Sequence, residues 1–439
     1  MKKIINYLSA GVLCASISSQ TCAQVDSFFV VGVHPTAVLQ PTISGKQLKT
    51  LFPWKGKLYS GYGDYNDNTG PIDIFSFSTD SLKFIHESIA NTEAVYNYKA
   101  INGMLYAPAI DRRGSGDFAK MDSNGIWGNY KFGSYNSEHV YDAAGLNDSV
   151  LFMVGSQSSN AAVWKSSNNG RTWNQILADS AISGKSGDFA RFYFAGVYNG
   201  NLYVQARDYY GSLHPSSKVY NGSTWSNGPS LFPLSGSLGW RPEVFAGKLV
   251  YRSWEPGNTT PLRSFDGINN AWVNSLYVFD CVIDSNYFYA LVDSGYGVLN
   301  IRRTNDLVNW QNLMKVPYTS RSLAILNDKL FVGTKDSKIM QYTKPVSLLN
   351  PVTTFIKEVT FETDQIRIYP NPAKQNFNIS LPKGNCDIVI TDLAGRNIYK
   401  LKNISDNLNI DSKNFNAGIY IVQVILGRKI LNERLIIFK

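Results

Sequence analysis

The stretch Tyr198-Asn199-Gly200-Asn201-Leu202-Tyr203 decides the fold, because it is one of seven recognisable copies of the same phrase. Asn-Gly and related pairs tolerate the positive φ angles of a two-residue hairpin turn, and the apolar residues on both sides form the paired strands. Each copy therefore predicts a strand, a tight turn and a second strand. The other copies, four clear and two looser, have their turns at Lys55-Gly56, Asn102-Gly103, Ala246-Gly247, Asn327-Asp328, Asp148-Ser149 and Ser285-Asn286.

The copies are spaced like the units of a repeat protein. Their last residues, 39 to 51 positions apart, are Tyr59, Tyr106, Phe152, Tyr203, Val250, Tyr289 and Phe331. All but the last are followed, 21 to 25 positions later, by an aromatic residue: Phe84, Trp127, Trp173, Trp225, Trp272 and Trp310. That interval has room for a third strand and a turn into a fourth. Four strands per unit at this period are typical of β-propellers, so we predict an all-β chain with a seven-bladed β-propeller over residues 25–345.

The seventh unit ends early. Its third strand is predicted over residues 338–342, and Lys344-Pro345 follows before any aromatic fourth strand. The strand-like run Phe28 to Val31 precedes the first unit and is left over. We expect this run to complete the last blade, because such a closure removes two exposed sheet edges.

The N-terminus predicts export. Lys2 and Lys3 precede an apolar run from Ile4 to about Ile17, and small residues follow, so residues 1–23 are interpreted as a signal peptide cleaved near Ala23. No later stretch has the roughly 18 uninterrupted apolar residues of a membrane helix, so no transmembrane segment is expected. The formal charge of +9 is scattered, without a run of Lys or Arg, which argues against a nucleic-acid partner.

Cysteine and histidine give no sign of a metal or cofactor. Cys281 and Cys386 fall in different predicted domains, so two free thiols are expected. The four histidines show neither the spacing of paired ligands nor a shared loop. We therefore expect no cofactor and no metal site.

One turn resembles a known motif. Ser166-Ser167-Asn168-Asn169-Gly170-Arg171-Thr172-Trp173 resembles the Asp-box of sialidase-like propellers, with Asn168 in the place of the aspartate. The Ser and Asn side chains are expected to bond the turn's own backbone, Gly170 to take the unusual dihedral angle and Trp173 to pack between sheets. The resemblance implies a propeller fold and says little about activity, because the turn joins third and fourth strands, away from the usual site.

A different domain is predicted after a linker over residues 346–365. Residues 366–439 contain short alternating strands typical of a small immunoglobulin-like sandwich. Here the chain resembles the type A C-terminal sorting domain of the type IX secretion system. The resemblance rests on four segments, whose matching residues include Tyr369, Pro370, Asn371, Pro372, Gly395, Gly418, Tyr420 and the terminal Lys439. It implies export by the type IX machinery, removal of the domain by its sortase, and attachment to the outer surface or release.

The candidate ligand residues lie on the loops that leave the second strand of each blade, and near the starts of the innermost strands. Tyr and Trp beside carboxylates are typical of carbohydrate sites, where rings stack on sugars and polar groups bind hydroxyls. Asp208, Tyr209, Trp254, Glu255, Asp293 and Tyr296 are candidates of this kind. Arg191, Arg241 and Arg321 precede three hairpin phrases at similar distances and are expected to converge on a carboxylate or sulfate. Ordinary polar loops and ordinary ion pairing are the alternatives for the two sets.

These observations favour a secreted or cell-surface propeller that binds an extracellular glycan or protein without catalysis. The alternative is a glycan-active enzyme, a glycoside hydrolase or a lyase. Asp208, Glu255 and Asp293 would then supply paired carboxylates across the propeller axis.

Overall fold

The computed structural model describes residues 27–349 and 366–439, apart from 115, 134–136, 233–236, 256–259, 275, 296, 382–383 and 427–428. The chain divides into two compact units, Met1–Val352 and Thr353–Lys439. The predicted signal peptide and residues 350–365 of the predicted linker lie outside the described residues. No helix in the described ranges is long and apolar enough to cross a membrane.

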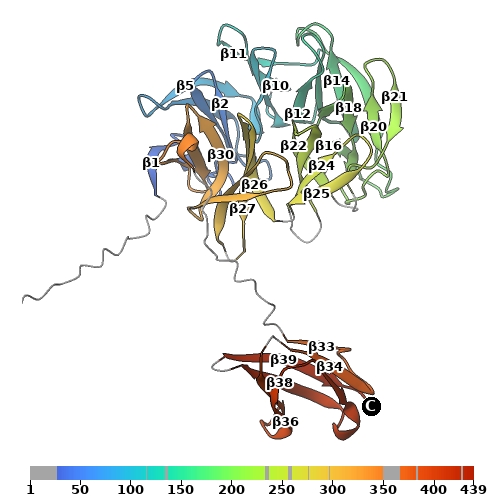
Figure 1. Ribbon diagram of the computed structural model, residues 1–439. Helices are drawn as coiled ribbons and strands as arrows, with labels where there is room; N and C mark the ends of the chain where they lie inside the picture. The colour runs from blue at the N-terminus through green and yellow to red at the C-terminus, as the bar shows by residue number, and fades with distance from the viewer. Residues whose placement is uncertain are drawn as a thin grey trace, which may run out of the picture. The chain divides into compact units, whose positions relative to one another are not determined.

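The first unit is a ring of seven four-stranded antiparallel sheets, the blades of a β-propeller (Figure 1). Blade 1 consists of β2 (Thr50–Trp54), β3 (Lys57–Gly61), β4 (Ile72–Ser78) and β5 (Lys83–Ala90). Blade 2 consists of β7 (Lys99–Ile101), β8 (Met104–Pro108), β10 (Phe118–Met121) and β11 (Trp127–Tyr130). Blade 3 consists of β12 (His139–Gly145), β13 (Leu151–Gln157), β14 (Asn160–Ser166) and β15 (Asn174–Ser180).

The next three blades repeat this order. Blade 4 consists of β17 (Gly196–Tyr198), β18 (Asn201–Val204), β20 (Ser217–Tyr220) and β21 (Trp225–Gly228). Blade 5 consists of β22 (Leu238–Phe245), β23 (Lys248–Trp254), β24 (Leu262–Phe265) and β25 (Asn270–Asn274). Blade 6 consists of β26 (Tyr277–Asp284), β27 (Tyr287–Asp293), β28 (Leu299–Thr304) and β29 (Gln311–Val316).

Blade 7 is completed by the N-terminal strand, as the sequence predicted. Its sheet has the order β1 (Phe28–Val33), β32 (Lys338–Tyr342), β31 (Lys329–Thr334) and β30 (Ser320–Leu326). β1 pairs antiparallel with β32, from Phe28 opposite Tyr342 to Val33 opposite Lys338. Val31 is 8% exposed and belongs to the hydrophobic cluster shared with blade 1. The ring is thus closed by backbone hydrogen bonds between the two ends of the propeller.

The hairpin turns have the backbone that their sequences require. In the copy over residues 198–203, Asn199 and Gly200 have φ angles of 47° and 74°. In the first copy along the chain, Lys55 and Gly56 have φ angles of 45° and 76°. Positive φ at both central residues is the conformation that matches strand twist. All seven aromatic or apolar residues that end the copies lie on second strands and are at most 7% exposed.

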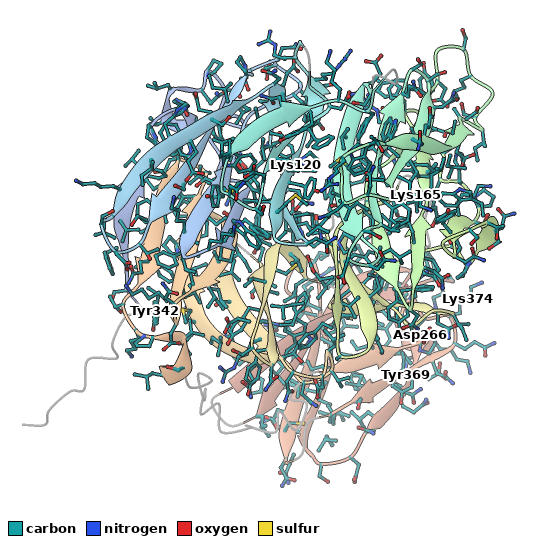
Figure 2. The ribbon with its side chains drawn as sticks, turned by 90° about the horizontal axis from the view of Figure 1, so that it is seen from above. Lys120, Lys165, Asp266, Tyr342, Tyr369 and Lys374 are labelled. Carbon is teal, nitrogen blue, oxygen red and sulfur yellow. The ribbon has the colours of Figure 1, made fainter. Side chains whose placement is uncertain are left out.

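Side chains fill the spaces between blades (Figure 2). Trp164 on β14 is fully buried and stacks on Phe132 with ring centroids 4.4 Å apart. Lys165 on the same strand, labelled in Figure 2, donates to the Tyr220 hydroxyl of blade 4 at 3.0 Å. Blade 3 is therefore fixed to its neighbours by both apolar packing and a polar contact.

The turn between β14 and β15 bonds itself as expected from its sequence. The Ser166 hydroxyl accepts from the Gly170 amide at 2.8 Å, and the Asn168 side-chain oxygen accepts from the Thr172 amide at 2.9 Å. Gly170 has a φ of 76°, and Trp173 is 7% exposed. The relation of this turn to the Asp-box of sialidases stays a prediction.

Two short ribbons and two short helices complete the first unit. β6 (Thr92–Ala94) pairs with β9 (Ile110–Arg112), and β16 (Ala190–Phe192) pairs with β19 (Ala206–Asp208). The 3-10 helix η1 (Ala37–Leu39) follows β1, and η2 (Val346–Leu348) follows β32. The Val346 amide donates to the Asp328 carbonyl at 2.8 Å, and Leu349 is buried against blades 6 and 7. The packed propeller therefore includes residues 346–349, which the sequence had suggested as linker.

The second unit is a sandwich of two sheets. One sheet has the order β33 (Arg367–Tyr369), β34 (Asn376–Ser380) and β37 (Leu408–Asp411), with the 3-10 helix η3 (Ser412–Asn414) after β37. The other has the order β36 (Asn397–Ile404), β35 (Cys386–Asp392), β38 (Gly418–Leu426) and β39 (Lys429–Ile437). Its core includes Phe377, Ile390, Val422 and Leu435, all fully buried.

Ring closure by β1 can be tested with two neighbouring valines. Val31→Asp places an unpaired carboxylate in the core and should lower the free energy of unfolding by about 3 kcal/mol. Val30, which is 47% exposed on the same strand, is the matched control. Val30→Asp should change the free energy of unfolding by less than about 0.5 kcal/mol. Urea titration of the two variants measures the difference, and equal stabilities would contradict the closure.

Candidate functional site

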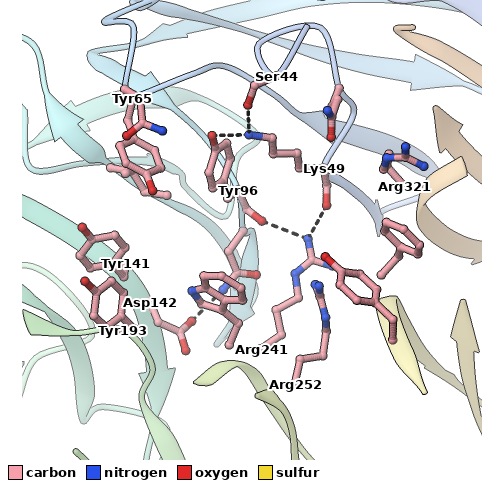
Figure 3. A pocket seen from close by; sticks show the side chains of 17 residues that line it. Ser44, Lys49, Tyr65, Tyr96, Tyr141, Asp142, Tyr193, Arg241, Arg252 and Arg321 are labelled. Atoms are coloured by element: carbon pink, nitrogen blue, oxygen red, sulfur yellow. Dashed lines mark hydrogen bonds between the residues drawn. The ribbon is translucent and has the colours of Figure 1, made fainter. Parts of the chain in front are cut away.

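A cavity of about 460 Å³, which we call the upper cavity, lies at one end of the propeller axis (Figure 3). It is on the face that carries the loops between second and third strands and between successive blades. Each of the seven blades, or the connection leading into it, contributes to the lining. The lining residues are Ser44, Gln47, Lys49, Tyr65, Asn66, Tyr96, Asn97, Ile110, Tyr141, Asp142, Tyr193, Trp240, Arg241, Arg252, Tyr277, Phe279 and Arg321.

β-bulges direct side chains into this cavity. In four blades the strand register shifts near the start of the innermost strand, at Val140/Asp142, Trp240/Glu243, Val278/Asp280 and Ser320/Ser322. Tyr141, Arg241, Phe279 and Arg321 fall inside these shifts and all line the cavity. A bulge leaves one residue out of the ladder and re-aims its side chain, which explains how regular strands supply a converging set.

Tyrosines form one side of the cavity. The rings of Tyr141 and Tyr193 are 4.6 Å apart between centroids, and those of Tyr65 and Tyr96 are 5.9 Å apart. In Figure 3, Tyr65, Tyr141 and Tyr193 lie across the cavity from Arg241, Arg252 and Arg321. Such rings offer flat apolar faces and polar hydroxyls together.

Two arginines on the opposite side form no ion pair at contact distance with a carboxylate of the described residues. Arg252 donates from Nε to the Val278 carbonyl at 3.0 Å, and Arg321 donates to the carbonyls of Tyr318 and Ser320. Within the described residues, neither lies within 4.0 Å of an Asp or Glu oxygen. Burial lowers the pKa of both guanidinium groups, but an arginine keeps its charge at neutral pH. The cavity therefore contains positive charge available to an anion.

Lys49 adds a third cation between these two sides. Its Nζ donates to the Ser44 hydroxyl at 2.9 Å and to the Tyr96 hydroxyl, and it lies 3.9 Å from the centre of the Tyr96 ring. Burial lowers the pKa of Lys49 to about 8, against the opposing effect of Asp64. The lysine is thus mostly protonated at neutral pH.

Arg241 forms the floor of the cavity. From blade 5 it makes an ion pair with Asp280 of blade 6, and its Nη2 donates to the carbonyls of Lys49 at 3.1 Å and Tyr96 at 3.0 Å. It also lines a second cavity of about 470 Å³, bounded by the innermost strands. In this second cavity Lys99 pairs with Glu243 at 3.0 Å. Arg241 therefore lies between the two cavities, with its donors used by the protein itself.

Asp142 is the carboxylate in the described lining of the upper cavity. It accepts hydrogen bonds from the Asn97 amide at 2.8 Å and from the backbone amides of Ala143 and Ala195. Burial raises the pKa of Asp142 to about 6. Its oxygens are engaged with three partners, so it fixes blade 3 to its neighbours.

The predicted arginine trio converges only in part. Arg241 and Arg321 line the upper cavity, and Arg191 on β16 does not. Arg191 instead contacts the His139 ring nitrogen at 3.1 Å, and its guanidinium lies over the Phe189 ring at 4.4 Å. Arg241 is engaged in the floor, so Arg321 is the member of the trio that faces the cavity with its charge unpaired.

The predicted carboxylates do not meet across the axis, and none of them lines the cavity. Asp208 is fully buried and accepts from the amides of Ile182 and Ser183 and from His214. Glu255 is 3% exposed and bonds Arg263, while Asp293 accepts from the Gly295 amide at 2.7 Å.

The predicted aromatic candidates lie apart from one another. Tyr209 is 60% exposed beside Phe189, and Trp254 packs against Arg207 with the guanidinium 5.5 Å from its ring. Tyr296 lies outside the described residues. Neither Tyr209 nor Trp254 lines the cavity.

Lys49, Arg252, Tyr96, Tyr141 and Tyr193 line the cavity but were not predicted from the sequence. A signal for some of them exists at the start of the innermost strands. Val95-Tyr96-Asn97, Val140-Tyr141-Asp142 and Val278-Phe279-Asp280 share one pattern, a buried Val, an aromatic residue and an Asn or Asp. The aromatic residue of each lines the cavity. Arg252, inside a regular strand, gives no comparable signal.

In the described part of the chain, no group of three or more His, Cys, Asp or Glu side chains could hold a metal ion. His139 contacts Asp111 and Ser156, but Ser156 is 1% exposed and cannot meet a substrate. Cys281 and Cys386 are free thiols.

In the second unit, the candidate sorting residues stabilise turns and strand ends. The Asn371 side chain accepts from the Ile436 amide at 2.9 Å and donates to the Arg434 carbonyl, which fixes the segment around Pro370 and Pro372 to β39. Gly395 has a φ of 77° in the turn closed by Asp392.

The other candidate sorting residues lie around β38 and the C-terminus. Gly418 begins β38, opposite Ile437, and the buried Tyr420 donates to the Asn416 carbonyl at 2.9 Å. Tyr369 is 54% exposed, and Lys439 donates to the Lys413 carbonyl.

Comparison with protein families decides the role of this unit, because residues 367–438 match the family described as "Secretion system C-terminal sorting domain". The second unit is a type IX sorting domain. A sorting domain of this kind implies that the protein is exported by the type IX machinery and reaches the outside or the outer surface of the cell.

Similar solved structures are distant. PorZ of Porphyromonas gingivalis, described as an essential surface component of the type IX secretion system, has a TM-score of 0.46 and 15% identity. The match covers 90% of this chain, which spans only 59% of that one. Virginiamycin B lyase of Staphylococcus aureus has a TM-score of 0.48 and 8% identity, over 72% of this chain and 99% of that one. A comparison with curated protein sequences found no match.

The buried Asp179–His214–Asp208 group predicts a pH-dependent stability. Burial opposes a charge on His214, but hydrogen bonds and the charges of Asp179 and Asp208 raise its pKa above the ordinary value of 6.5. The charged histidine therefore stabilises the fold fully below about pH 6.5, and this contribution is lost as the pH rises through the folded-state pKa. The stability difference between the native protein and His214→Asn should shrink as the pH is raised from about 6 to 9, as measured by urea titration. A constant difference would contradict the charged state.

Deletion of residues 366–439 tests the sorting domain. We expect the truncated protein to accumulate in the periplasm, because the propeller alone lacks the signal for the type IX machinery. Cell fractionation and surface labelling of intact cells measure this. Unchanged arrival of the truncated protein at the surface would contradict the assignment.

Proposed function

We propose that the exported propeller binds an extracellular acidic glycan in the upper cavity, with its carboxylate or sulfate group between Arg252 and Arg321. The observation that carries the proposal is the pair of arginines without carboxylate partners, which face tyrosines across a cavity of about 460 Å³. An anionic sugar would meet positive charge on one side and aromatic faces on the other.

The chemistry of the lining supports a glycan over a flat protein surface. Small-molecule ligands occupy concave sites of roughly 300–1,000 Å³ with a few fixed polar groups, and this cavity has that size. Tyr141 and Tyr193 offer ring faces for stacking, and Asn66 and Gln47 offer amides for hydroxyl groups. A surface protein that inserts an acidic side chain is the other ligand compatible with these groups.

The floor should strengthen the interaction with an anion. A hydrogen bond between charged groups is worth about 1.5–3 kcal/mol, and salt screens it less where water is excluded. Arg241 lies between this cavity and the second one. Arg252 and Arg321 line the same cavity as Arg241.

Catalysis on a glycan is the second candidate. Hydrolysis by two carboxylates requires a pair facing the substrate, and Asp142, whose oxygens are engaged, is the one carboxylate in the described lining. Lys49, with its lowered pKa and its contact to the Tyr96 hydroxyl, is the group best suited to remove a proton in a lyase reaction. The cationic and aromatic lining supports binding as the leading proposal.

The finer details of export are also part of the proposal. A signal peptide cleaved near Ala23 would start the route across the inner membrane. The sortase of the type IX system would then remove the sorting domain, leaving the propeller attached to the outer surface or released.

A glycan array followed by calorimetry tests the binding proposal. Arg321→Ala and Arg252→Ala should each weaken binding of an acidic glycan at least about tenfold, because each removes a charged hydrogen bond. Arg171→Ala is the matched control, since Arg171 lies on the turn at the opposite face. Equal binding of acidic and neutral glycans, or unchanged affinity in both variants, would contradict the proposal. Turnover of a bound glycan that is lost in Lys49→Met would favour the enzyme instead.

A further inference from the structure

A row of aromatic rings and cations leads from the upper cavity to the loops of blade 4. We call it the blade-4 track. Each member contacts the next, and the members in order are Tyr193, Tyr141, His139, Arg191, Phe189, Tyr209, Tyr210 and Lys185. The separations between ring centroids, or between a charged group and a ring, are 4.4–5.6 Å, and Arg191 lies 3.1 Å from His139.

The outer half of the blade-4 track is open to solvent. Tyr141 and His139 are 8% and 9% exposed, whereas Tyr209 and Tyr210 are 60% and 50% exposed. Two adjacent exposed tyrosines, with Lys185 at one end and Arg191 beyond Phe189, expose apolar surface that a binding partner would cover. Groups of rings separated by Arg191 and Lys185 suit a ligand that offers both flat faces and negative charges.

The loops that carry the exposed rings are held rigidly. The Asp188 carboxylate accepts from the amides of Phe189 at 3.0 Å and Tyr210 at 3.3 Å, and the Tyr209 amide donates to the Phe189 carbonyl at 2.8 Å. Beneath them the buried Asp208 joins the 182–183 segment to His214. Asp208, a candidate ligand residue in the sequence, is therefore a positioning residue for this surface.

We propose that the blade-4 track is a second subsite, which binds further units of an acidic polysaccharide whose first unit occupies the upper cavity. This inference rests on the proposed function of that cavity. Tyr209 and Tyr210 would stack on sugar rings, and Lys185 and Arg191 would pair with their carboxylate or sulfate groups. A polysaccharide fits better than a compact ligand, because the track is a chain of successive contacts that continues from Tyr193 and Tyr141 of the cavity lining.

The length of the ligand is the variable that tests the blade-4 track. Calorimetry of the mature protein would compare heparin-derived disaccharides with octasaccharides, and galacturonate oligomers of the same two lengths. We expect the longer ligand to bind at least about tenfold more tightly, which corresponds to about 1.4 kcal/mol. The double variant Tyr209→Ala/Tyr210→Ala should lose this gain and keep the native affinity for the disaccharide.

Two variants complete the experiment. Trp272→Ala, at an aromatic residue 61% exposed on the outermost strand of blade 5, is the control and should keep the gain with length. Arg252→Ala should weaken both lengths equally. Thermal melting of every variant verifies that the fold is intact.

The outcomes separate the two proposals. Native protein that binds both lengths equally, or a double variant that keeps the gain, would overturn the blade-4 track and leave the cavity proposal standing. Failure of the native protein to bind either length would overturn the proposed function and the track together. Binding of an acidic peptide in place of both glycans, lost in the double variant, would also overturn the polysaccharide proposal.

Discussion

The guanidinium group of Arg241 is the contact on which the upper cavity depends. A ring of blades leaves an open space along its axis, and a through-channel would keep both ends in contact with water. Arg241 reaches from blade 5 to backbone carbonyls at the starts of blades 1 and 2 and pairs with Asp280 of blade 6. The buried charge is acceptable because it is paired with Asp280 and its Nη2 donates two hydrogen bonds. The axial space is thereby divided, and the upper part becomes a cavity with a floor.

The tight turns and the cavity lie at opposite ends of the same strands. The tight turns at one face are built from local chemistry: residues with positive φ between first and second strands, and side chains such as Asn168 and Asp306 that bond their own turn between third and fourth strands. The other face holds bulges, longer loops and the unpaired cations. Because the turns fix the register of each blade, the bulges at the far end can vary in residue type without disturbing the ring.

The sequence predicted the propeller well because its signals are short-range. Asn199-Gly200 and its copies specify a turn by backbone conformation alone. The nearly constant distance from each copy to the next aromatic residue indicates how many strands a unit contains, whatever their packing. Even the closure by residues 28–31 followed from counting strands. The match of the sorting domain likewise depends on turns, such as those at Asn371 and Gly395, whose side chains and backbone act locally.

The residues that line the cavity could be predicted only in part. Arg321 was found because it stands at a fixed distance from its hairpin, but the same rule selected Arg191, which contacts His139 instead. Asp208 and Glu255 have the residue type of a ligand site, but the fold engages both carboxylates, with the Ser183 amide for Asp208 and with Arg263 for Glu255. An arginine without a carboxylate partner, such as Arg252, is visible only once seven blades have been brought around one axis.

Closure of the ring by β1 also has a consequence for biogenesis. Phe28 pairs with Tyr342, so the last blade joins residues at the two ends of the propeller sequence. Blades 1 to 6 each consist of strands that are neighbours in the sequence, so each can fold as soon as its own segment is free to do so. Blade 7 cannot form until β32 is also available to pair with β1. Long-range pairing of this kind is slow because the intervening chain has to be ordered first. Until then the strand edges of β1 and β32 are unprotected, and this interval is when the exported chain is most exposed to aggregation and to proteases.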